Sequence, residues 1–305
     1  MKRAISVSLG SSKRDKTVEI ELLGQQVRLE RIGTNGDIEK AARMYQELDG
    51  KIQAFGVGGA DLGLMVADHW YPLHSIQPMV RFVHQTPLVD GTGLKITLEK
   101  RVTPLLNEKL NGHNAQKRVL VVAGVDRWGL SQAFLKAGYQ CIFGDFMFAL
   151  NLPIPIRSEH TLKKFAAFLL PLVSRLPFHW VYPVGEAQEK RTPKWNKYFD
   201  WASVIAGDCH YIRRYMPEQM QGKSIVTNTT TPEDVAYFRK AGIKYLITTT
   251  PVLEGRSFGT NMMEAGLVAA LGRTKQINYA QPGSYFNELD AVLDQLNLAP
   301  QLQEL

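Results

Sequence analysis

The stretch VLVVAGVDRWGLSQAFLKAGYQCIFGDF, residues 119–146, decides the fold of this chain. It begins with an unbroken apolar run, turns at Gly124, continues in a helical pattern that ends at Gly138, and returns to a second apolar run. A glycine directly after a buried strand lets the chain turn into a helix, whose free N–H groups and positive dipole end attract anions. This order is typical of a doubly wound parallel sheet that binds a dinucleotide.

The same stretch matches most of the dinucleotide-binding fingerprint. Gly124 and Gly129 take the first and last glycines of G-x-G-x-x-G, and Asp145 follows at about the 20-residue distance expected for the acid that binds an adenosine ribose. Asp126, followed by Arg127, replaces the middle glycine, and a carboxylate there repels a diphosphate unless it points away. These five residues are our cofactor-binding candidates. A doubly wound domain that binds another ligand, or none, is the alternative.

The rest of the chain after residue 115 repeats the strand–helix alternation. We predict strands at 119–123, 140–143, 179–182, 203–206, 224–227 and 245–248, and helices at 130–137, 159–172, 211–216, 232–241 and 261–271. Thr231, Pro232 and Asp234 predict a capping box at one helix start. Because strand ends line the ligand crevice of such sheets, we also assign three residues that follow strands to the cofactor: Asn228, Thr229 and Thr250.

The N-terminal third is a smaller α/β domain. Strands are predicted at 4–9, 18–23, 26–32 and 52–57, a hairpin within 62–73, and helices from Asp37, at 75–84 and after Asp90, the last with a kink at Pro104. Residues 111–114 form the expected linker. The predicted domains are a substrate domain at 1–114, a Rossmann-like NAD(P)-binding domain at 115–275, and a segment at 276–305 whose helix, 285–296, returns to the first domain.

The motif Asp90-Gly91-Thr92-Gly93 supplies the catalytic candidates. Asp90 stands at a strand end, and Lys95 stands in the first turn of the following helix, where a cation opposes the helix dipole. A cation so placed beside a carboxylate fits a proton-transfer pair, so Asp90 and Lys95 are predicted to be catalytic. An ordinary surface lysine is the alternative for Lys95.

Other loops of the chain carry candidate substrate-binding residues. Ser11 and Ser12 lie in a basic loop that either binds an anion or is simply solvated, and Asp61 follows paired glycines that favour close backbone approach. Asn261 follows a glycine-bounded loop with Arg256, suited to closing over a ligand, or else it caps its own helix. Together with Thr92 of the glycine motif, these residues form the predicted substrate site.

The cysteine content excludes some classes of protein. Cys141 and Cys209 are too few for a disulfide scaffold or an all-cysteine metal cage and fit a reducing cytoplasm, and no metal site is predicted. Cys209 beside His210 suggests either a nucleophile–base pair or the start of a helix. The choice between these two interpretations stays open from the sequence.

Composition and charge set the broad class. The chain has 305 residues, 45% of them hydrophobic, with 36 Lys+Arg against 29 Asp+Glu and a net charge of +7. This is enough chain for one large or two medium domains. The apolar run at 165–176 is too short and interrupted to span a membrane, and residues 1–16 contain no apolar signal region. The basic residues are not interleaved with aromatic ones, so the sequence lacks the pattern that would indicate nucleic-acid binding. We expect a cytoplasmic protein.

The motifs SVSLGSSKRD, VDGTGLKITLE, NTTTPED and TTTPVLEGRSFGTN resemble a bacterial family labelled quinate 5-dehydrogenase, within the shikimate/quinate dehydrogenase-like group, over nearly the whole chain. The resemblance implies two α/β domains and a nicotinamide cofactor. Asp90 matches the aspartate that in shikimate dehydrogenases pairs with a lysine at the substrate hydroxyl. That lysine has no counterpart here, and we suggest Lys95 as its substitute. A similar domain order occurs in cyanobacterial acyl-carrier-protein reductases, where Cys209 would be the acyl-carrying thiol.

From the sequence we therefore predict an NAD(P)-dependent oxidoreductase acting on a small hydroxy or oxo substrate. Because an acid such as Asp145 binds a ribose 2′-OH and repels a 2′-phosphate, NAD is the expected cofactor and NADP the alternative. The expected partner is a small-molecule substrate. We expect no binding to nucleic acid or to a membrane, and the chain could form a homodimer. The rival interpretations are a non-catalytic ligand-binding or regulatory protein on the same fold, and a thiol-dependent acyl reductase.

Overall fold

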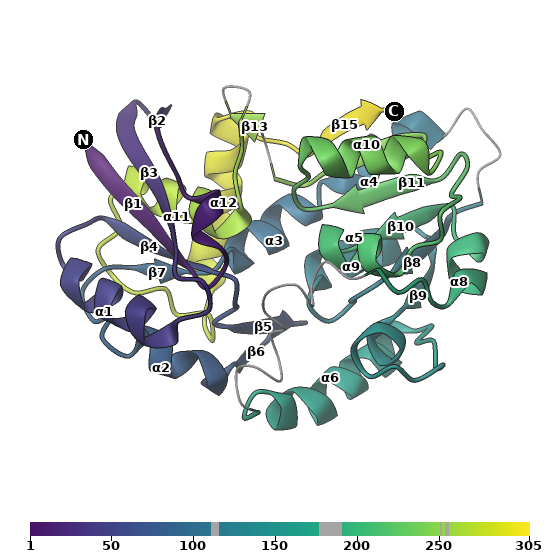
Figure 1. The fold of residues 1–305 in the computed structure, drawn as a ribbon, viewed down its shortest axis with the longest axis horizontal. Helices are drawn as coiled ribbons and strands as arrows, with labels where there is room; N and C mark the ends of the chain where they lie inside the picture. The colour runs from purple at the N-terminus through teal and green to yellow at the C-terminus, as the bar shows by residue number, and fades with distance from the viewer. Residues whose placement is uncertain (111–115, 177–190, 251, 254–255) are drawn as a thin grey trace. The chain divides into compact units, whose positions relative to one another are not determined.

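The computed structural model describes residues 1–110, 116–176, 191–250, 252–253 and 256–305 (Figure 1). The chain divides into two compact units, each built from three segments. The first unit consists of Met1–Leu94, Phe168–Gln188 and Gly259–Asn297, and the second of Lys95–Ala167, Glu189–Phe258 and Leu298–Leu305. Within the described residues, no helix is both long and apolar enough to cross a membrane.

The first unit contains a five-stranded sheet in the order β2-β3-β1-β4-β7. Strand β1 is parallel to β3 and β4, β4 is parallel to β7, and β2 and β3 form an antiparallel hairpin. The hairpin turns at Leu23 and Gly24, which both have positive φ, as a tight two-residue turn requires. The strands are β1 (Lys2–Ser8), β2 (Lys16–Leu22), β3 (Gln25–Gly33), β4 (Ala54–Gly58) and β7 (Leu88–Val89).

Helices cover both faces of this sheet because side chains alternate along its strands. Ile5 and Val7 of β1 pack in one core with Tyr45 of α1 (Ile38–Leu48), whereas Ser6, between them, bonds Asn261 of α11 (Thr260–Leu271) on the opposite face. Helix α11 packs against β1, β3 and β4 and is buried along most of its length. The unit also contains the hairpin β5 (Gly63–Val66) and β6 (His69–Pro72), the short α2 (Gln77–Val80), and α12 (Gly283–Gln295).

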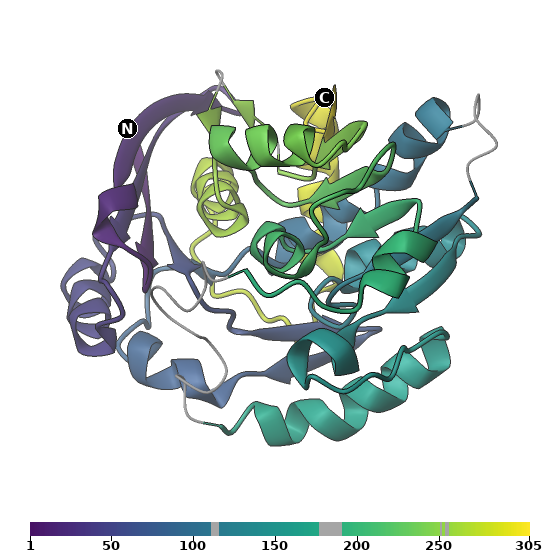
Figure 2. The same cartoon turned by 45° about the vertical axis from the view of Figure 1, so that its right-hand side comes forward.

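The second unit contains a six-stranded sheet in the order β15-β12-β11-β10-β8-β9. Five strands are parallel, and only the C-terminal β15, near the C mark in Figure 2, is antiparallel to its neighbour β12. The chain runs from β8 outward to β9 and later to β10 on the other side, so the strand order reverses between β8 and β10. The strands are β8 (Arg118–Val121), β9 (Gln140–Phe143), β10 (Val204–Ala206), β11 (Ser224–Thr227), β12 (Tyr245–Thr248) and β15 (Gln301–Glu304).

Helices pack on this parallel sheet to give a Rossmann-like α/β fold, which confirms the predicted fold class. The apolar residues of its parallel strands are almost completely buried. Strands whose apolar residues do not alternate with polar ones must be covered on both faces of the sheet. Among the described residues, the α-helices that lie wholly or partly in this unit are α3 (Thr92–Glu99), α4 (Val102–Leu110), α5 (Trp128–Lys136), α6 (Glu159–Val173), α8 (Asn196–Trp201), α9 (Cys209–Tyr215) and α10 (Pro232–Lys240). A π-helical turn, η3 (Asp145–Ala149), follows β9.

Most predicted elements are confirmed, including the helix at 285–296, which is α12 of the first unit. The predicted strand at 179–182 and linker at 111–114 lie outside the described residues. Helix α11, expected in the second domain, is grouped with the first unit because its buried side chains pack on that unit's sheet. The polar strand β15 was not predicted, since its sequence QLQE carries no apolar alternation.

Two predicted helices are wrong in extent. The helix at 75–84 ends at Val80, because the Asp49 carboxylate accepts the backbone N–H groups of His84, Gln85 and Thr86 and holds that segment in another conformation. The helix after Asp90 breaks at residues 100–101, between α3 and α4, and not at Pro104. Pro104 lies in the first turn of α4, where its missing N–H costs nothing.

The capping box predicted at α10 is present and is testable. The Thr231 hydroxyl accepts the Asp234 N–H at 3.2 Å, and the Asp234 carboxylate accepts the Thr231 N–H at 2.7 Å. We expect Thr231→Ala to lower the free energy of unfolding by about 1 kcal/mol in urea denaturation. The neighbouring Thr230→Ala is the control and should change it by less than about 0.5 kcal/mol. Equal effects of both variants would contradict a capping role.

Candidate functional site

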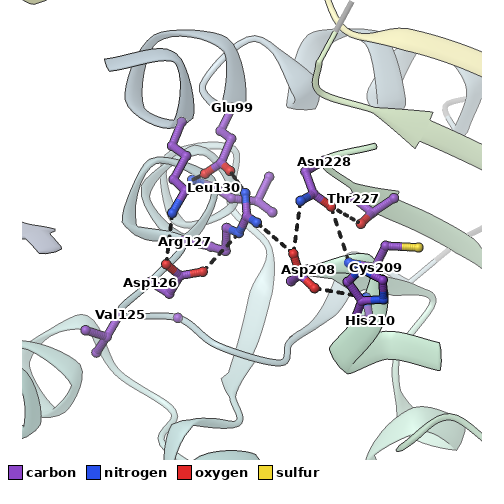
Figure 3. Close-up of polar contacts among 12 residues, drawn as sticks. Glu99, Val125, Asp126, Arg127, Leu130, Asp208, Cys209, His210, Thr227 and Asn228 are labelled. Carbon is purple, nitrogen blue, oxygen red and sulfur yellow. Dashed lines mark hydrogen bonds and ion pairs between the residues drawn. The ribbon is translucent and has the colours of Figure 1, made fainter. Parts of the chain in front are cut away.

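Polar residues follow four adjacent strands of the second unit at their carboxyl ends. Figure 3 shows those after β8, β10 and β11. Asp126 and Arg127 lie in the turn after β8, Asp145 follows β9, Asp208 follows β10, and Asn228 follows β11. In open α/β sheets, ligands bind outside the carboxyl ends of the strands, where the strand order reverses. The reversal between β8 and β10 therefore marks this edge as the candidate site.

Asp145 holds the glycine turn from the end of β9. Its two carboxylate oxygens accept the backbone N–H groups of Gly124 at 3.0 Å and Val125 at 2.9 Å. A Cβ on Gly124 would lie 2.7 Å from Phe143 and 3.1 Å from Asp145, so this close approach requires glycine. The Asp145 side chain is buried, and burial raises its pKa to about 6.

Arg127 lies at the centre of a cluster of carboxylates. Its guanidinium lies 2.8 Å from Glu99 Oε1, 3.2 Å from Asp126 Oδ2 and 3.2 Å from Asp208 Oδ2. The Arg127 and Glu99 side chains are 4% and 1% exposed. Burial alone would lower the pKa of Arg127, but the surrounding carboxylates more than compensate and raise it above its ordinary value. The arginine therefore carries its charge permanently and ties three segments together.

Helix α3 contributes Lys95 and Glu99, one turn apart on the same face. Lys95 Nζ lies 3.2 Å from Asp126 Oδ1 in the turn after β8, and both Lys95 and Asp90 have further contacts. Glu99 Oε2 accepts the Leu130 N–H at 3.1 Å and thereby caps α5. A Cβ on Gly129 would lie 2.7 Å from the Lys95 carbonyl oxygen, so this glycine serves the packing of α5 against α3.

Among the three acids beside Arg127, the pKa values of Glu99 and Asp126 move in opposite directions. Burial raises the pKa of Glu99 above its ordinary value despite the opposing charge of Arg127. Burial also opposes ionisation of Asp126, but the charges of Lys95 and Arg127 outweigh it and lower the Asp126 pKa. Asp126 is therefore a fixed negative charge at the position where the dinucleotide fingerprint has a glycine.

The cluster reaches solvent at Asp126 and Asp208, whose side chains are 29% and 23% exposed. Asp208 caps α9 by accepting the His210 N–H at 2.9 Å, and it also accepts the Asn228 side-chain amide at 2.9 Å. The Asn228 side-chain carbonyl oxygen accepts the Cys209 N–H at 3.3 Å. Cys209 itself is buried, and burial raises the pKa of its thiol, which disfavours a nucleophilic role.

This arrangement is unfavourable for the diphosphate of a dinucleotide. A diphosphate needs free N–H groups and a positive field. Here, carboxylates already accept the N–H groups of Gly124, Val125 and Leu130, and the Arg127 N–H bonds the Ala123 carbonyl. The charged side chains of the cluster are four acids and two bases, namely Glu99, Asp126, Asp145 and Asp208 against Lys95 and Arg127.

The remaining cofactor candidates lie at the same edge. Thr229 is half-buried after β11, and Thr250 is buried after β12, where its N–H donates to the Asn228 backbone carbonyl at 3.1 Å. Sequence reasoning missed Glu99. The available signal was its position one turn after Lys95, since residues four apart share one helix face. Within the described residues, no group of three His, Cys, Asp or Glu side chains is arranged to hold a metal ion.

In the first unit, four of the predicted substrate and catalytic residues lie near one strand end. The Asp90 carboxylate accepts the N–H groups of Leu62, next to Asp61, at 2.6 Å and of Thr92 at 2.9 Å. Asn261 packs against Gly91, where an added Cβ would lie 2.9 Å from the Asn261 nitrogen. Asp90 is buried and also has contacts beyond these two.

Ser11 and Ser12 are placed differently, in an exposed turn after β1. The Ser11 hydroxyl accepts the Lys13 N–H at 3.2 Å, and the Ser12 hydroxyl accepts the Asn35 side-chain amide at 3.1 Å. Both side chains thus serve the local conformation where β1 and β3 end.

A second buried acid in the first unit, Glu264 of α11, was not predicted. Its Oε1 accepts the hydroxyls of Tyr285 at 2.6 Å and Tyr279 at 3.2 Å, and its Oε2 accepts the Leu94 N–H at 3.2 Å. Burial, followed by the nearby charge of Asp90, raises the pKa of Glu264 to about 7. The only sequence signal was a lone acid inside an apolar helix.

The fold and the site together define a two-unit α/β protein with a Rossmann-like second unit. The chain belongs to the family described as "Domain of unknown function (DUF8754)", whose model matches residues 93–305. A second model, "Domain of unknown function (DUF8753)", matches residues 3–90. No curated protein matches the chain.

Solved structures that resemble the chain include two malic enzymes and a dipicolinate synthase. A putative malic enzyme is 12% identical with a TM-score of 0.39, covering 95% of this chain and 77% of its own. An NAD-dependent malic enzyme from Thermotoga maritima is 12% identical with a TM-score of 0.38, covering 94% and 76%. The dipicolinate synthase A chain from Bacillus subtilis is 11% identical with a TM-score of 0.31, covering 96% and 79%. At these scores the likenesses concern general architecture alone.

Proposed function

We propose that the protein is a ligand-binding or regulatory protein whose second unit binds a small ligand without phosphate at the carboxyl ends of its strands. One observation carries the proposal: the cluster at this edge has more acids than bases, and both bases are already paired with acids. The partly exposed oxygens of Asp126 and Asp208 are acceptors. They match a ligand that carries a positive charge, amino groups or hydroxyl groups.

Arg127 is the positioning residue in this proposal. Its guanidinium contacts both Asp126 and Asp208, so the two carboxylates that reach solvent are held on either side of one rigid cation. Asn228 adds a second restraint on Asp208 through its side-chain amide. A preorganised pair of acceptors loses little entropy when a ligand binds, which favours affinity.

A calorimetric comparison of two nucleoside ligands of opposite charge tests the proposal. We expect the cationic S-adenosylmethionine to bind at least tenfold more tightly than the anionic NAD, a difference of about 1.4 kcal/mol. Asp208→Asn should weaken the binding of S-adenosylmethionine several-fold. Asp200→Asn, at an exposed acid of the same unit, is the matched control and should leave this affinity unchanged. Micromolar binding of NAD, or an unchanged affinity in Asp208→Asn, would refute the proposal.

A second candidate function is an NAD(P)-dependent oxidoreductase of the quinate/shikimate dehydrogenase-like kind. The position of Asp145 favours it, because an acid at the end of the second strand beside the glycine turn is where a Rossmann fold binds ribose. Asp90 would then be its proton-handling acid. In that case NAD should bind at least tenfold more tightly than NADP, Asp145→Ala should erase most of that preference, and Asp126→Gly should tighten both cofactors.

A further inference from the structure

The first unit contains a cavity, open to solvent, that is separate from the candidate site at the strand ends of the second unit. It has a volume of about 210 Å³ and lies between the β5–β6 hairpin and the C-terminal end of α6. Its walls include Trp70 and Tyr71 of the hairpin and Leu170 and Pro171 of the helix, with Arg175 beyond the helix end. An apolar cavity of about 150 Å³ binds benzene, so this volume suits a single-ring molecule.

The walls of this cavity are held in place by contacts outside it. Trp70 lies against Gly63, where an added Cβ would come within 2.4 Å of the indole, and it stacks on Tyr279 with ring centroids 4.7 Å apart. The His74 N–H donates to the Ser174 carbonyl at 2.9 Å and joins the hairpin to the end of α6. The aromatic wall is therefore formed before any ligand arrives, as is usual for small-molecule sites.

The charged residue in the lining of the cavity favours an anionic ligand. Arg175 is the charged residue of its lining; His69 and His74 add donors, and no carboxylate lines it among the described residues. A guanidinium prefers a carboxylate, which it binds with two parallel hydrogen bonds. Trp70, Tyr71 and Leu170 give the lining aromatic and aliphatic groups, which suit a ring. We propose that this cavity binds a small aromatic carboxylate, with the ring against Trp70 and the carboxylate paired with Arg175.

Benzoate and its neutral analogue benzamide have nearly the same shape and test the proposal. Titration calorimetry, followed in parallel by tryptophan fluorescence, should show benzoate binding at least tenfold more tightly than benzamide. Arg175→Gln should weaken benzoate at least tenfold and leave benzamide within about twofold. Arg157→Gln, at an exposed arginine of the second unit, is the control and should change neither. Trp70→Leu should weaken both ligands.

Both arginines lie at exposed positions, so their variants should fold normally, and circular dichroism with a thermal melt verifies this. Equal binding of the two ligands would overturn the proposal, as would unchanged benzoate affinity in Arg175→Gln. The absence of benzoate binding at concentrations up to about 10 mM would also overturn it. The cavity lies wholly in the first unit, so these outcomes are independent of the ligand proposed for the strand ends of the second unit.

Discussion

Replacing Arg127 with methionine is expected to lower the free energy of unfolding by about 3–5 kcal/mol, because it leaves a buried carboxylate without its partner. Glu99 is 1% exposed and lies 2.8 Å from the Arg127 guanidinium. Its other oxygen caps α5 through the Leu130 N–H, so the unpaired charge would also weaken the start of that helix. Urea denaturation followed by circular dichroism measures the loss.

A double variant separates the buried charge from the lost packing of the arginine side chain. Adding Glu99→Gln to Arg127→Met removes the unpaired carboxylate, so the double variant should be more stable than the sum of the two single changes predicts. Arg157→Met, at an exposed position, is the control and should stay within about 0.5 kcal/mol of the parent. A loss below about 1 kcal/mol in Arg127→Met would show that the cluster contributes little to stability.

The stability of the protein is also expected to depend on pH through Glu264. Burial raises the pKa of this carboxyl from 4.5 to about 7, so the folded state favours the protonated form. Its contribution is fully present below the unfolded pKa of 4.5 and is lost as the pH rises through about 7. A shift of this size corresponds to about 3 kcal/mol.

Glu264→Gln removes this titration while keeping the shape of the side chain. The difference in free energy of unfolding between the parent and Glu264→Gln should therefore change by about 3 kcal/mol between about pH 4 and pH 8, with the parent losing stability toward high pH. Glu47→Gln, at an exposed position on α1 of the same unit, should run parallel to the parent. Parallel curves for Glu264→Gln as well would mean that Glu264 titrates at its ordinary value.

Local sequence determined the parallel sheet of the second unit and many of its connections. The run at 119–123 is apolar without alternation, which suits only a strand covered on both faces, and Gly124 directly after it predicts a sharp turn into a helix. The capping box from Thr231 to Asp234 likewise involves residues three apart. These features were predictable because the interacting groups are close in sequence or share one pattern.

The partners of the charged side chains were decided only by the tertiary structure. Asp145 stands where the fingerprint places a ribose acid, yet its carboxylate bonds the turn that begins at Gly124. Lys95 pairs with Asp126, and Glu99 reaches Arg127 and the start of α5, because α3 packs against α5 close to Gly129. A charged side chain is stabilised by groups within a few ångströms, whatever their distance along the chain. The sequence pattern therefore determines which edge of the sheet carries the charges, and the packing of helices against that edge determines which charges are cancelled.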